Sequence, residues 1–404
     1  MATIRPFAAL RPRPADAARI AAVPYDVVTT DEAREQAGDN PLSFLRVSRA
    51  ELELPPGTDP YADAVYERAV QNFERLKKIA FVVEDEPALY LYRLQSGAHE
   101  QLGLAASYSL DEYDRDVIKK HERTRKDKED DRTRHMLELR AQTGVVFLTY
   151  RAASAIDALV HRISATAPFE DFVAADGISH TLWRVPVEDE AALVSAFASL
   201  QALYIADGHH RAASAARARA EIEKGGRGAG AASQFLAVAF PDRQVQILPY
   251  HRVVRSLGGL TAEGFLARLR ERMRVREGAA APAGAGRVSM YLAGQWHEIE
   301  LPRAPAGTSR ADALDVAVLE REILGAVLGI GDIRTDKRID FVGGGRGTSE
   351  LERRVDSRDA DVAFSLHPVG IDDLMAIADA GGIMPPKSTW FEPKLRDGLL
   401  VHLI

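Results

Sequence analysis

Short apolar runs alternate with helical segments along the whole chain, and this alternation restricts the fold more than any other feature of the sequence. Residues 145–150 and 202–208 have the length and apolar content of strands, whereas apolar side chains recur at helical spacing in residues 59–79. Two alternating runs, residues 88–95 and 99–110, flank a Ser-Gly pair and indicate a β-hairpin. We therefore expect an α/β to α+β fold with mixed sheets.

Near the N-terminus, two shorter patterns give local predictions. The stretch VPYDVV (residues 23–28) is apolar enough to form the end of a strand. The stretch TTDEAREQAGDN that follows is typical of a capped helix, with Thr30 as the candidate N-cap and Gly38 near the C-terminal end.

A chain of 404 residues is long for one domain, and a hydrophobic content of 46% is ample for more than one core. The pattern of helices and strands begins again at about Leu257. We therefore expect an N-terminal region, residues 1–256, that carries the functional site, and a C-terminal α+β domain, residues 257–404.

Composition excludes several classes of protein. The chain has no cysteine, which rules out disulfides, thiolate metal sites and cysteine nucleophiles and fits a reducing cytoplasm. Arginines and prolines interrupt residues 1–19, and no apolar run approaches the roughly 18–20 residues of a membrane helix. A net charge of −7 argues against general nucleic-acid binding. We expect a soluble cytoplasmic protein that binds small molecules, and the sequence specifies no oligomeric state.

The stretch ALYIADGHHR carries the densest group of candidate functional side chains, at the passage from an apolar strand into an alanine-rich helix. A helix N-terminus attracts anions, and Gly208 would let a ligand approach the backbone closely. His209, His210 and Arg211 add donors suited to phosphate oxygens. Asp207 is suited to hold Mg²⁺ against those phosphates. The alternative is that Asp207 only caps the helix while the histidines pair with nearby carboxylates.

A second candidate site lies in the charge-dense segment of residues 117–144, which contains KKHERT and DDR. His121 is a possible phosphate ligand, and Glu122 beside it is a possible general base. The alternative is a solvated helix face or a mobile loop, which is what most charged runs form. The sequence alone does not show whether Glu122 and Asp207 meet in space.

Two further stretches are candidate substrate contacts. Tyr25 and Asp26 lie in VPYDVV, and a simple turn is the alternative for them. Lys387, Ser388 and Thr389 lie in MPPKSTWFEPKL, whose lysines could reach a carboxylate or phosphate. An aromatic plug that seals the C-terminal strand is the alternative for this loop.

The run FVGGGRGTSELERR, residues 341–354, joins an expected strand to an expected helix through several glycines. It lacks the Lys-Ser/Thr of a P-loop and the glycine spacing of the dinucleotide fingerprint. We interpret it as a plain βα turn, with a phosphate contact through its backbone amides as the alternative.

The motifs VPYDVV, KKHERT…DDR, ADGHHR and MPPKSTWFEPKL occur in this order, and together they resemble the family known as domain of unknown function number 1015. The resemblance covers nearly the whole chain. That family is similar to the ParB/sulfiredoxin-like superfamily, whose fold binds nucleotides and which includes free L-serine kinases that use ADP or ATP. The resemblance therefore implies a ParB/sulfiredoxin-like nucleotide-binding core in the N-terminal region.

The resemblance also implies roles for individual residues. Glu122 would be the base for an acceptor hydroxyl, His121 a phosphate or substrate ligand, and Asp207 to Arg211 the platform for the nucleotide phosphates and Mg²⁺. The expected function is Mg²⁺-dependent phosphoryl transfer from ADP or ATP to a small hydroxylated metabolite, with L-serine as the first candidate. The alternative is a regulatory switch of the ParB-like type that binds a nucleotide without transferring phosphate. The loop MPPKSTWFEPKL is a candidate to fold back onto this site.

Overall fold

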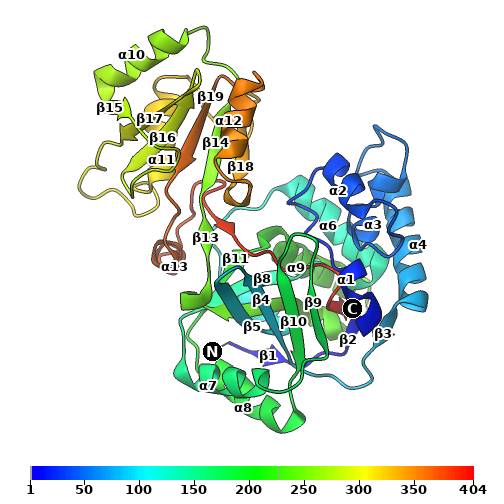
Figure 1. Ribbon diagram of the computed structural model, residues 1–404. Coiled ribbons are helices and arrows are strands. Elements are labelled where there is room, and N and C mark those ends of the chain that lie inside the picture. Colours follow the sequence, from blue (N-terminus) through cyan, green and yellow to red (C-terminus); the bar gives the residue numbers. More distant parts are fainter. Residues whose placement is uncertain (1, 227) are drawn as a thin grey trace. The chain divides into compact units, whose positions relative to one another are not determined.

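A computed structural model describes residues 2–226 and 228–404 of the chain, which divides into two units (Figure 1). The first unit is Met1–Val245 together with Pro393–Ile404, and the second is Gln246–Glu392. This division differs from the expected one at residues 256 and 257. The difference arises because strand β14 (Tyr250–Val254) pairs within the sheet of the second unit, while the C-terminal strand pairs within the first.

The main sheet of the first unit has nine strands, both parallel and antiparallel, so the prediction of a mixed α+β fold is confirmed. Its strands are β1 (Ile4–Arg5), β4 (Tyr90–Ser96), β5 (His99–Ser109), β6 (Ile118–Lys119), β8 (Val146–Tyr150), β9 (Glu170–Val173), β10 (Ser179–Arg184), β11 (Leu203–Asp207) and β12 (Gln234–Pro241). They lie in the order β6-β11-β8-β12-β5-β4-β10-β9, with β1 paired to β5. The predicted hairpin is β4–β5, in which Ser96 pairs with His99.

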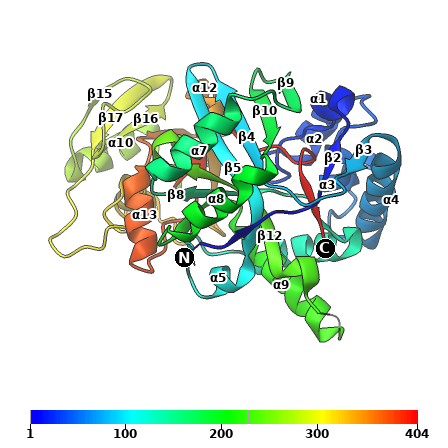
Figure 2. The ribbon, with the colours of Figure 1, turned by 90° about the horizontal axis from the view of Figure 1, so that it is seen from below.

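The helices of the first unit cover the main sheet and continue into a smaller subdomain. They are α1 (Ala17–Ile20), α2 (Thr30–Ala37), α3 (Leu45–Ser48), α4 (Asp63–Ile79), α5 (Leu110–Asp114), α6 (Lys126–Leu139), α7 (Ser154–Ser164), α8 (Val187–Ala198) and α9 (His209–Lys224). Short 3-10 turns occur at Pro14–Asp16, Ala50–Glu53, Gly230–Ser233 and Asp242–Gln244. Helix α7 packs against α8, and the two lie side by side in both views (Figures 1 and 2). Helix α6 packs against α9, which brings the charge-dense segment to the helix that follows β11.

Two of the local predictions near the N-terminus need correction. The N-cap of α2 is Thr29 rather than Thr30, because the Thr29 hydroxyl accepts the Glu32 N–H and the Glu32 carboxylate accepts the Thr29 N–H. The stretch VPYDVV forms a turn and not a strand, since the Val27 N–H donates to the Pro24 carbonyl at 3.2 Å. The predicted end of α2 at Gly38 is confirmed, as Gly38 is its C-cap.

A second, four-stranded sheet in the first unit ties together segments that are far apart in the sequence. Its strands are β2 (Ala9–Pro12), β3 (Phe81–Val83), β7 (Ala141–Gln142) and β21 (Val401–Leu403), in the order β3-β2-β21-β7. The C-terminal strand β21 therefore lies between β2 and β7. Val401 is fully buried in a core cluster formed with residues of α2, α3 and α4.

The second unit is built on a six-stranded antiparallel sheet with the order β15-β17-β16-β19-β14-β18. Its further strands are β13 (Ile247–Leu248), β15 (Val275–Glu277), β16 (Arg287–Leu292), β17 (Gln295–Glu300), β18 (Ile339–Gly343), β19 (Val362–Leu366) and β20 (Trp390–Phe391), of which β13 and β20 form a separate pair. Its helices are α10 (Ala262–Arg272), α11 (Asp315–Leu319), α12 (Ser349–Asp356) and α13 (Ile371–Asp379), with a π-helical turn at Glu320–Gly325 and a 3-10 turn at Gly344–Arg346.

Packing accounts for the glycine run between β18 and α12. A Cβ at Gly343 would collide with the Trp390 ring, and a Cβ at Gly344 would lie 2.6 Å from the Pro249 carbonyl oxygen. Trp390 also packs edge-on against Tyr250, with ring centroids 5.4 Å apart. The glycines therefore make room for an aromatic contact inside the second unit, which supports the interpretation as a plain βα turn.

Within the described residues of both units, every helix is too short or too polar to cross a bilayer.

Candidate functional site

The passage from β11 into α9 depends on a glycine with a left-handed backbone. Gly208 is the N-cap of α9 at φ 94°, and an added Cβ would lie 3.4 Å from both the Arg211 side chain and the Val146 Cα. Because the N-cap residue is a glycine, no N-cap side chain bonds to the first turn of α9. The Asp207 carboxylate instead accepts the N–H of Gly208 at 3.1 Å. Asp207 is therefore not the helix cap, and the first turn of α9 presents N–H groups that have no partner within the helix itself.

Asp207 is bound by a lysine from the C-terminal segment. The Lys394 ammonium donates to Asp207 Oδ2 at 3.2 Å, and the side chains are 9% and 28% exposed respectively. Burial alone would raise the pKa of Asp207, but the positive charges of Lys394 and Arg211 outweigh it and hold this pKa well below its usual range. Asp207 is thus an anion with a built-in counter-ion.

His121 and Glu122 lie directly beside the start of α9. The His121 and His209 rings contact edge to face, with centroids 4.4 Å apart. Glu122 Oε2 lies 3.9 Å from His209 Nδ1, and its side chain is 37% exposed. The structure thus brings the two candidate sites of the sequence analysis together.

Hydrogen bonding assigns the tautomer of His209. Its Nε2 accepts the backbone N–H of His121 at 3.4 Å, so in the neutral ring the proton sits on Nδ1, which faces Glu122. Burial lowers the pKa of His209 to about 3 despite the opposing effect of Asp207. At neutral pH His209 is therefore neutral and forms no charged pair with Glu122.

His121 is 2% exposed, and burial holds its pKa well below the usual value. The carbonyl of Ile205 is a hydrogen-bond partner of its ring, but its Nδ1 has no partner in the part of the chain that the structure describes. A buried acceptor left without a donor costs about 1–3 kcal/mol, so this nitrogen is available to a ligand.

His210 fixes the loop that carries Glu122. Its Nε2 accepts the backbone N–H of Arg125 at 3.0 Å, at the N-cap of α6. The adjacent histidines thus face different partners, His209 toward Glu122 and His210 toward the start of α6.

Arg211 draws the Tyr25–Asp26 turn into the same cluster. Its guanidinium donates to Asp26 Oδ1 at 2.8 Å and to the Val145 carbonyl at 2.8 Å. Arg211 is 2% exposed, and Asp26 and Asp207 hold its pKa above the usual value although burial opposes this. The geometry therefore gives Arg211 internal acceptors and makes it an organiser of the site.

Two residues of this cluster, Asp397 and Arg132, were not among the site residues predicted from the sequence. Lys394 is one of the two lysines of MPPKSTWFEPKL that were expected to reach a carboxylate or phosphate. Asp397 is 1% exposed, its Oδ2 has no partner among the described residues, and burial raises its pKa to about 7. The Arg132 guanidinium lies 4.2 Å from the centre of the Tyr25 ring. Arg132 and Lys394 lie within the motifs quoted above, and Asp397 lies two residues beyond the last of them, but their proximity depends on long-range strand pairing that no local pattern reveals.

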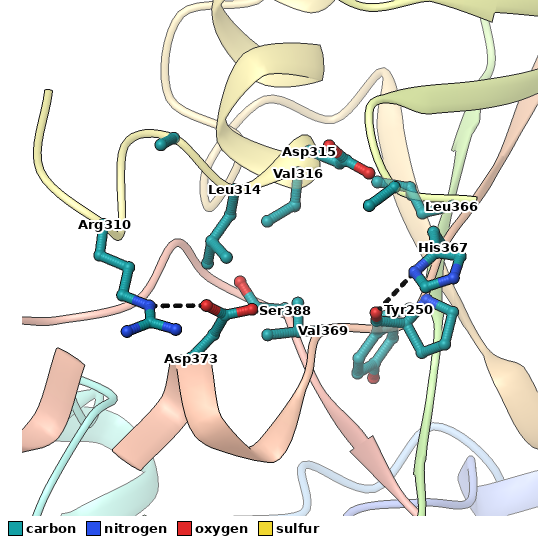
Figure 3. Close-up of a pocket in the computed structure, with 13 residues that line it drawn as sticks. Tyr250, Arg310, Leu314, Asp315, Val316, Leu366, His367, Val369, Asp373 and Ser388 are labelled. Carbon is teal, nitrogen blue, oxygen red and sulfur yellow. Dashed lines mark hydrogen bonds and ion pairs between the residues drawn. The ribbon is translucent and has the colours of Figure 1, made fainter. Parts of the chain in front are cut away.

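Lys387, Ser388 and Thr389 lie in the second unit. Ser388 there lines a cavity of about 200 Å³ together with Tyr250, Asp315 and His367 (Figure 3). The Lys387 ammonium lies 5.4 Å from the centre of the Tyr250 ring. The expected return of this loop to the first unit begins only at Pro393, so that Lys394 is the lysine that reaches Asp207.

The cluster contains two possible places for a cation. Asp207 offers a partly exposed carboxylate, which a hard ion such as Mg²⁺ would have to share with Lys394. His121, Glu122 and His209 each offer one ligand atom, and these atoms all lie within 4.8 Å of one another.

Comparison with known proteins gives a family and only distant structural likeness. The model of the family described as "Protein of unknown function (DUF1015)" matches residues 4–317. A search of curated proteins gave no significant match. A conserved hypothetical protein from Pyrococcus furiosus is 16% identical with a TM-score of 0.37, over 74% of this chain and 95% of its own. A free serine kinase in complex with AMP is 13% identical with a TM-score of 0.38, and the match covers 74% of this chain and 92% of the kinase chain. SbnI with a C-terminal truncation, from Staphylococcus aureus, is 13% identical with a TM-score of 0.40, and the match covers 74% of this chain and 87% of the SbnI chain. Scores at this level do not establish a shared fold.

Proposed function

This chain belongs to the family described as protein of unknown function DUF1015, and for it we propose Mg²⁺-dependent phosphoryl transfer from ADP or ATP to a small hydroxylated metabolite. L-serine is the first candidate acceptor. The observation that carries the proposal is the position of Glu122, 3.9 Å from His209 Nδ1 at the start of α9. A carboxylate base there adjoins a helix end that attracts phosphate.

Glu122 has the properties that a base for an alcohol requires. Its side chain is 37% exposed and so open to a substrate, and the buried His209 ring lies 3.9 Å from its Oε2. In the proposed step the acceptor oxygen forms a bond to the transferred phosphorus, the bond to the leaving nucleotide breaks, and the hydroxyl proton passes to Glu122. Positioning and charge neutralisation supply most of the catalysis in such transfers.

The first turn of α9 is the proposed phosphate platform. The N-cap Gly208 provides no side chain to bind its N–H groups, which carry the positive end of the helix dipole, and Lys394 adds a positive charge at Asp207. Mg²⁺ fits this platform if it takes the Asp207 carboxylate, which would free the Lys394 ammonium for a phosphate oxygen; when bound, the ion would neutralise phosphate charge. Tyr25 and Asp26 remain candidate substrate contacts because Arg211 binds Asp26 and Arg132 lies over the Tyr25 ring.

The second candidate function is a nucleotide-binding switch without transfer. The burial of Arg211 supports this alternative, because a guanidinium that is engaged with Asp26 and the Val145 carbonyl does not neutralise the charge that develops on a phosphoryl group during transfer. The two functions differ in whether a phosphorylated acceptor appears.

Phosphorus NMR of the protein with Mg²⁺, ADP or ATP, and a pool of hydroxy-metabolites that includes L-serine tests the proposal. We expect a new phosphomonoester signal from the wild-type protein and none from Glu122→Gln, while calorimetry shows nucleotide binding within a few-fold of wild type. The matched control is Glu138→Gln, which alters an exposed carboxylate of α6. A normal signal from Glu122→Gln would remove Glu122 as the base, and nucleotide binding without any new signal would favour the switch.

A further inference from the structure

We propose that His121, Glu122 and His209 form a binding site for a divalent transition-metal ion of the zinc class. One imidazole comes from the segment before α6, the carboxylate from the next residue, and the second imidazole from the first residue of α9. This site uses different ligands from the Mg²⁺ position proposed at Asp207, and its existence does not depend on phosphoryl transfer.

The donor set determines the class of ion. Two imidazole nitrogens and one carboxylate oxygen, within 4.8 Å of one another, resemble the three-ligand sets that hold zinc with a fourth position open. Imidazole suits zinc, cobalt, nickel and copper, whereas Mg²⁺ prefers oxygen ligands and retains its waters. The cluster should therefore select a transition metal over Mg²⁺.

His121 is already arranged as a metal ligand. The Ile205 carbonyl engages its ring, while Nδ1 is buried with no partner in the described chain. Histidine ligands commonly donate their second ring N–H to a backbone carbonyl, which fixes the tautomer and aims the free nitrogen at the metal. A metal ion would satisfy the nitrogen that the protein leaves unpaired.

His209 and Glu122 complete the site with one rearrangement. Coordination through His209 Nδ1 moves the ring proton to Nε2, which gives up the long 3.4 Å hydrogen bond from the His121 N–H. Glu122 is the least buried of the three ligands, so an ion would reach the site past its carboxylate. Because Glu122 is also the proposed base, a bound transition metal would occupy its carboxylate and suppress the proposed transfer.

Titration of the full-length, metal-stripped protein with Co²⁺ tests the site without reference to activity. We expect the visible absorption of a low-coordinate Co²⁺ complex that saturates at one equivalent, is displaced by Zn²⁺, and persists in excess Mg²⁺. Absence of this absorption, or its loss when Mg²⁺ is added, would overturn the proposal.

Variants identify the ligands. His121→Ala and His209→Ala should abolish the Co²⁺ spectrum, and Glu122→Gln, at a partly exposed side chain that should not impair folding, should weaken Co²⁺ affinity at least tenfold. The matched control is His161→Ala, which removes an exposed histidine of α7 and should leave the spectrum unchanged. A wild-type spectrum in Glu122→Gln would overturn the assignment even if the histidine variants fail to fold. If the metal binds as expected but no phosphoryl transfer is found, the metal site stands and the proposed function falls.

Discussion

At the scale of single residues, Arg211 shows how a side chain's partner can differ from the one that its motif suggests. The sequence places Arg211 beside two histidines at a helix start, which favours a phosphate ligand. The structure pairs it with Asp26, 185 residues away in the sequence, and with the Val145 carbonyl. The local pattern predicts which residues have side chains suited to binding or catalysis. It does not predict their partners, because contacts between residues so far apart in the sequence depend on the complete fold.

Asp397 gives a prediction about pH. Burial raises its pKa to about 7 in the folded protein, from 3.8 when solvated, so the folded state binds more protons than the unfolded state between these values. Its contribution to stability is therefore present at low pH and is lost as the pH rises toward 7. We expect Asp397→Asn to retain more of its stability than wild type as the pH rises from 4 to 7.

Urea denaturation of both proteins across this pH range provides the measurement. Burial also raises the pKa of Glu170 to about 7, so this residue too lowers the stability as the pH rises, and it does so equally in both proteins. Burial lowers the pKa of His135 to about 4, so this residue raises the stability as the pH rises, again equally in both proteins. The prediction therefore concerns the difference between the two curves, and parallel curves would contradict it.

At the scale of elements, the sequence predicts strands and helices whose apolar residues recur at regular spacing. It predicts the turns and helix ends between them less well. The hairpin β4–β5 follows from alternation around a Ser-Gly pair, and both partners are adjacent in the sequence. The N-cap of α2 was displaced by one residue, although the Thr-x-x-Glu pattern from Thr29 to Glu32 contains the signal for the capping box. VPYDVV resembles a strand in composition, but its conformation is set by Pro24 and by the contacts of Tyr25 and Asp26 with distant arginines.

The junction of β11 and α9 gives a prediction about Gly208. At φ 94° an alanine is strained, and its Cβ would press on the Arg211 side chain and on Val146. We expect Gly208→Ala to lower the free energy of unfolding by about 1–3 kcal/mol, as measured by urea denaturation. Gly284→Ala is the control, since that glycine has open space around its Cβ position and should change stability by less than about 0.5 kcal/mol. Equal effects at the two positions would show that the backbone at Gly208 relaxes without cost.

At the scale of the whole molecule, the C-terminal segment completes the first unit. Strand β21 pairs with β2 and β7, Val401 is buried in a core cluster, and Lys394 binds Asp207. The sequence pattern predicts two regions, but it places the chain's last residues in the C-terminal one. No local pattern distinguishes a strand that closes its own domain from one that returns to an earlier domain.

Removal of residues 393–404 should therefore damage the first unit selectively. We expect its thermal transition to fall by several degrees or to lose cooperativity, while the transition of the second unit, Gln246–Glu392, remains at its wild-type temperature. Calorimetry of the truncated chain measures both transitions. Lys394→Ala in the full-length chain, which removes the ammonium but keeps β21, should cause a smaller change. Unaltered melting of the truncated chain would show that β21 contributes little.

The placement of β21 also sets an order of assembly during synthesis. Residues 246–392 form a unit whose sheet uses no later part of the chain, so it can fold as soon as it leaves the ribosome. The first unit, although most of it is made earlier, lacks the strand between β2 and β7 until residues 401–403 emerge. The domain that begins at the N-terminus is thus the last to be finished, and until then the nascent chain exposes an open sheet edge on each side of the gap.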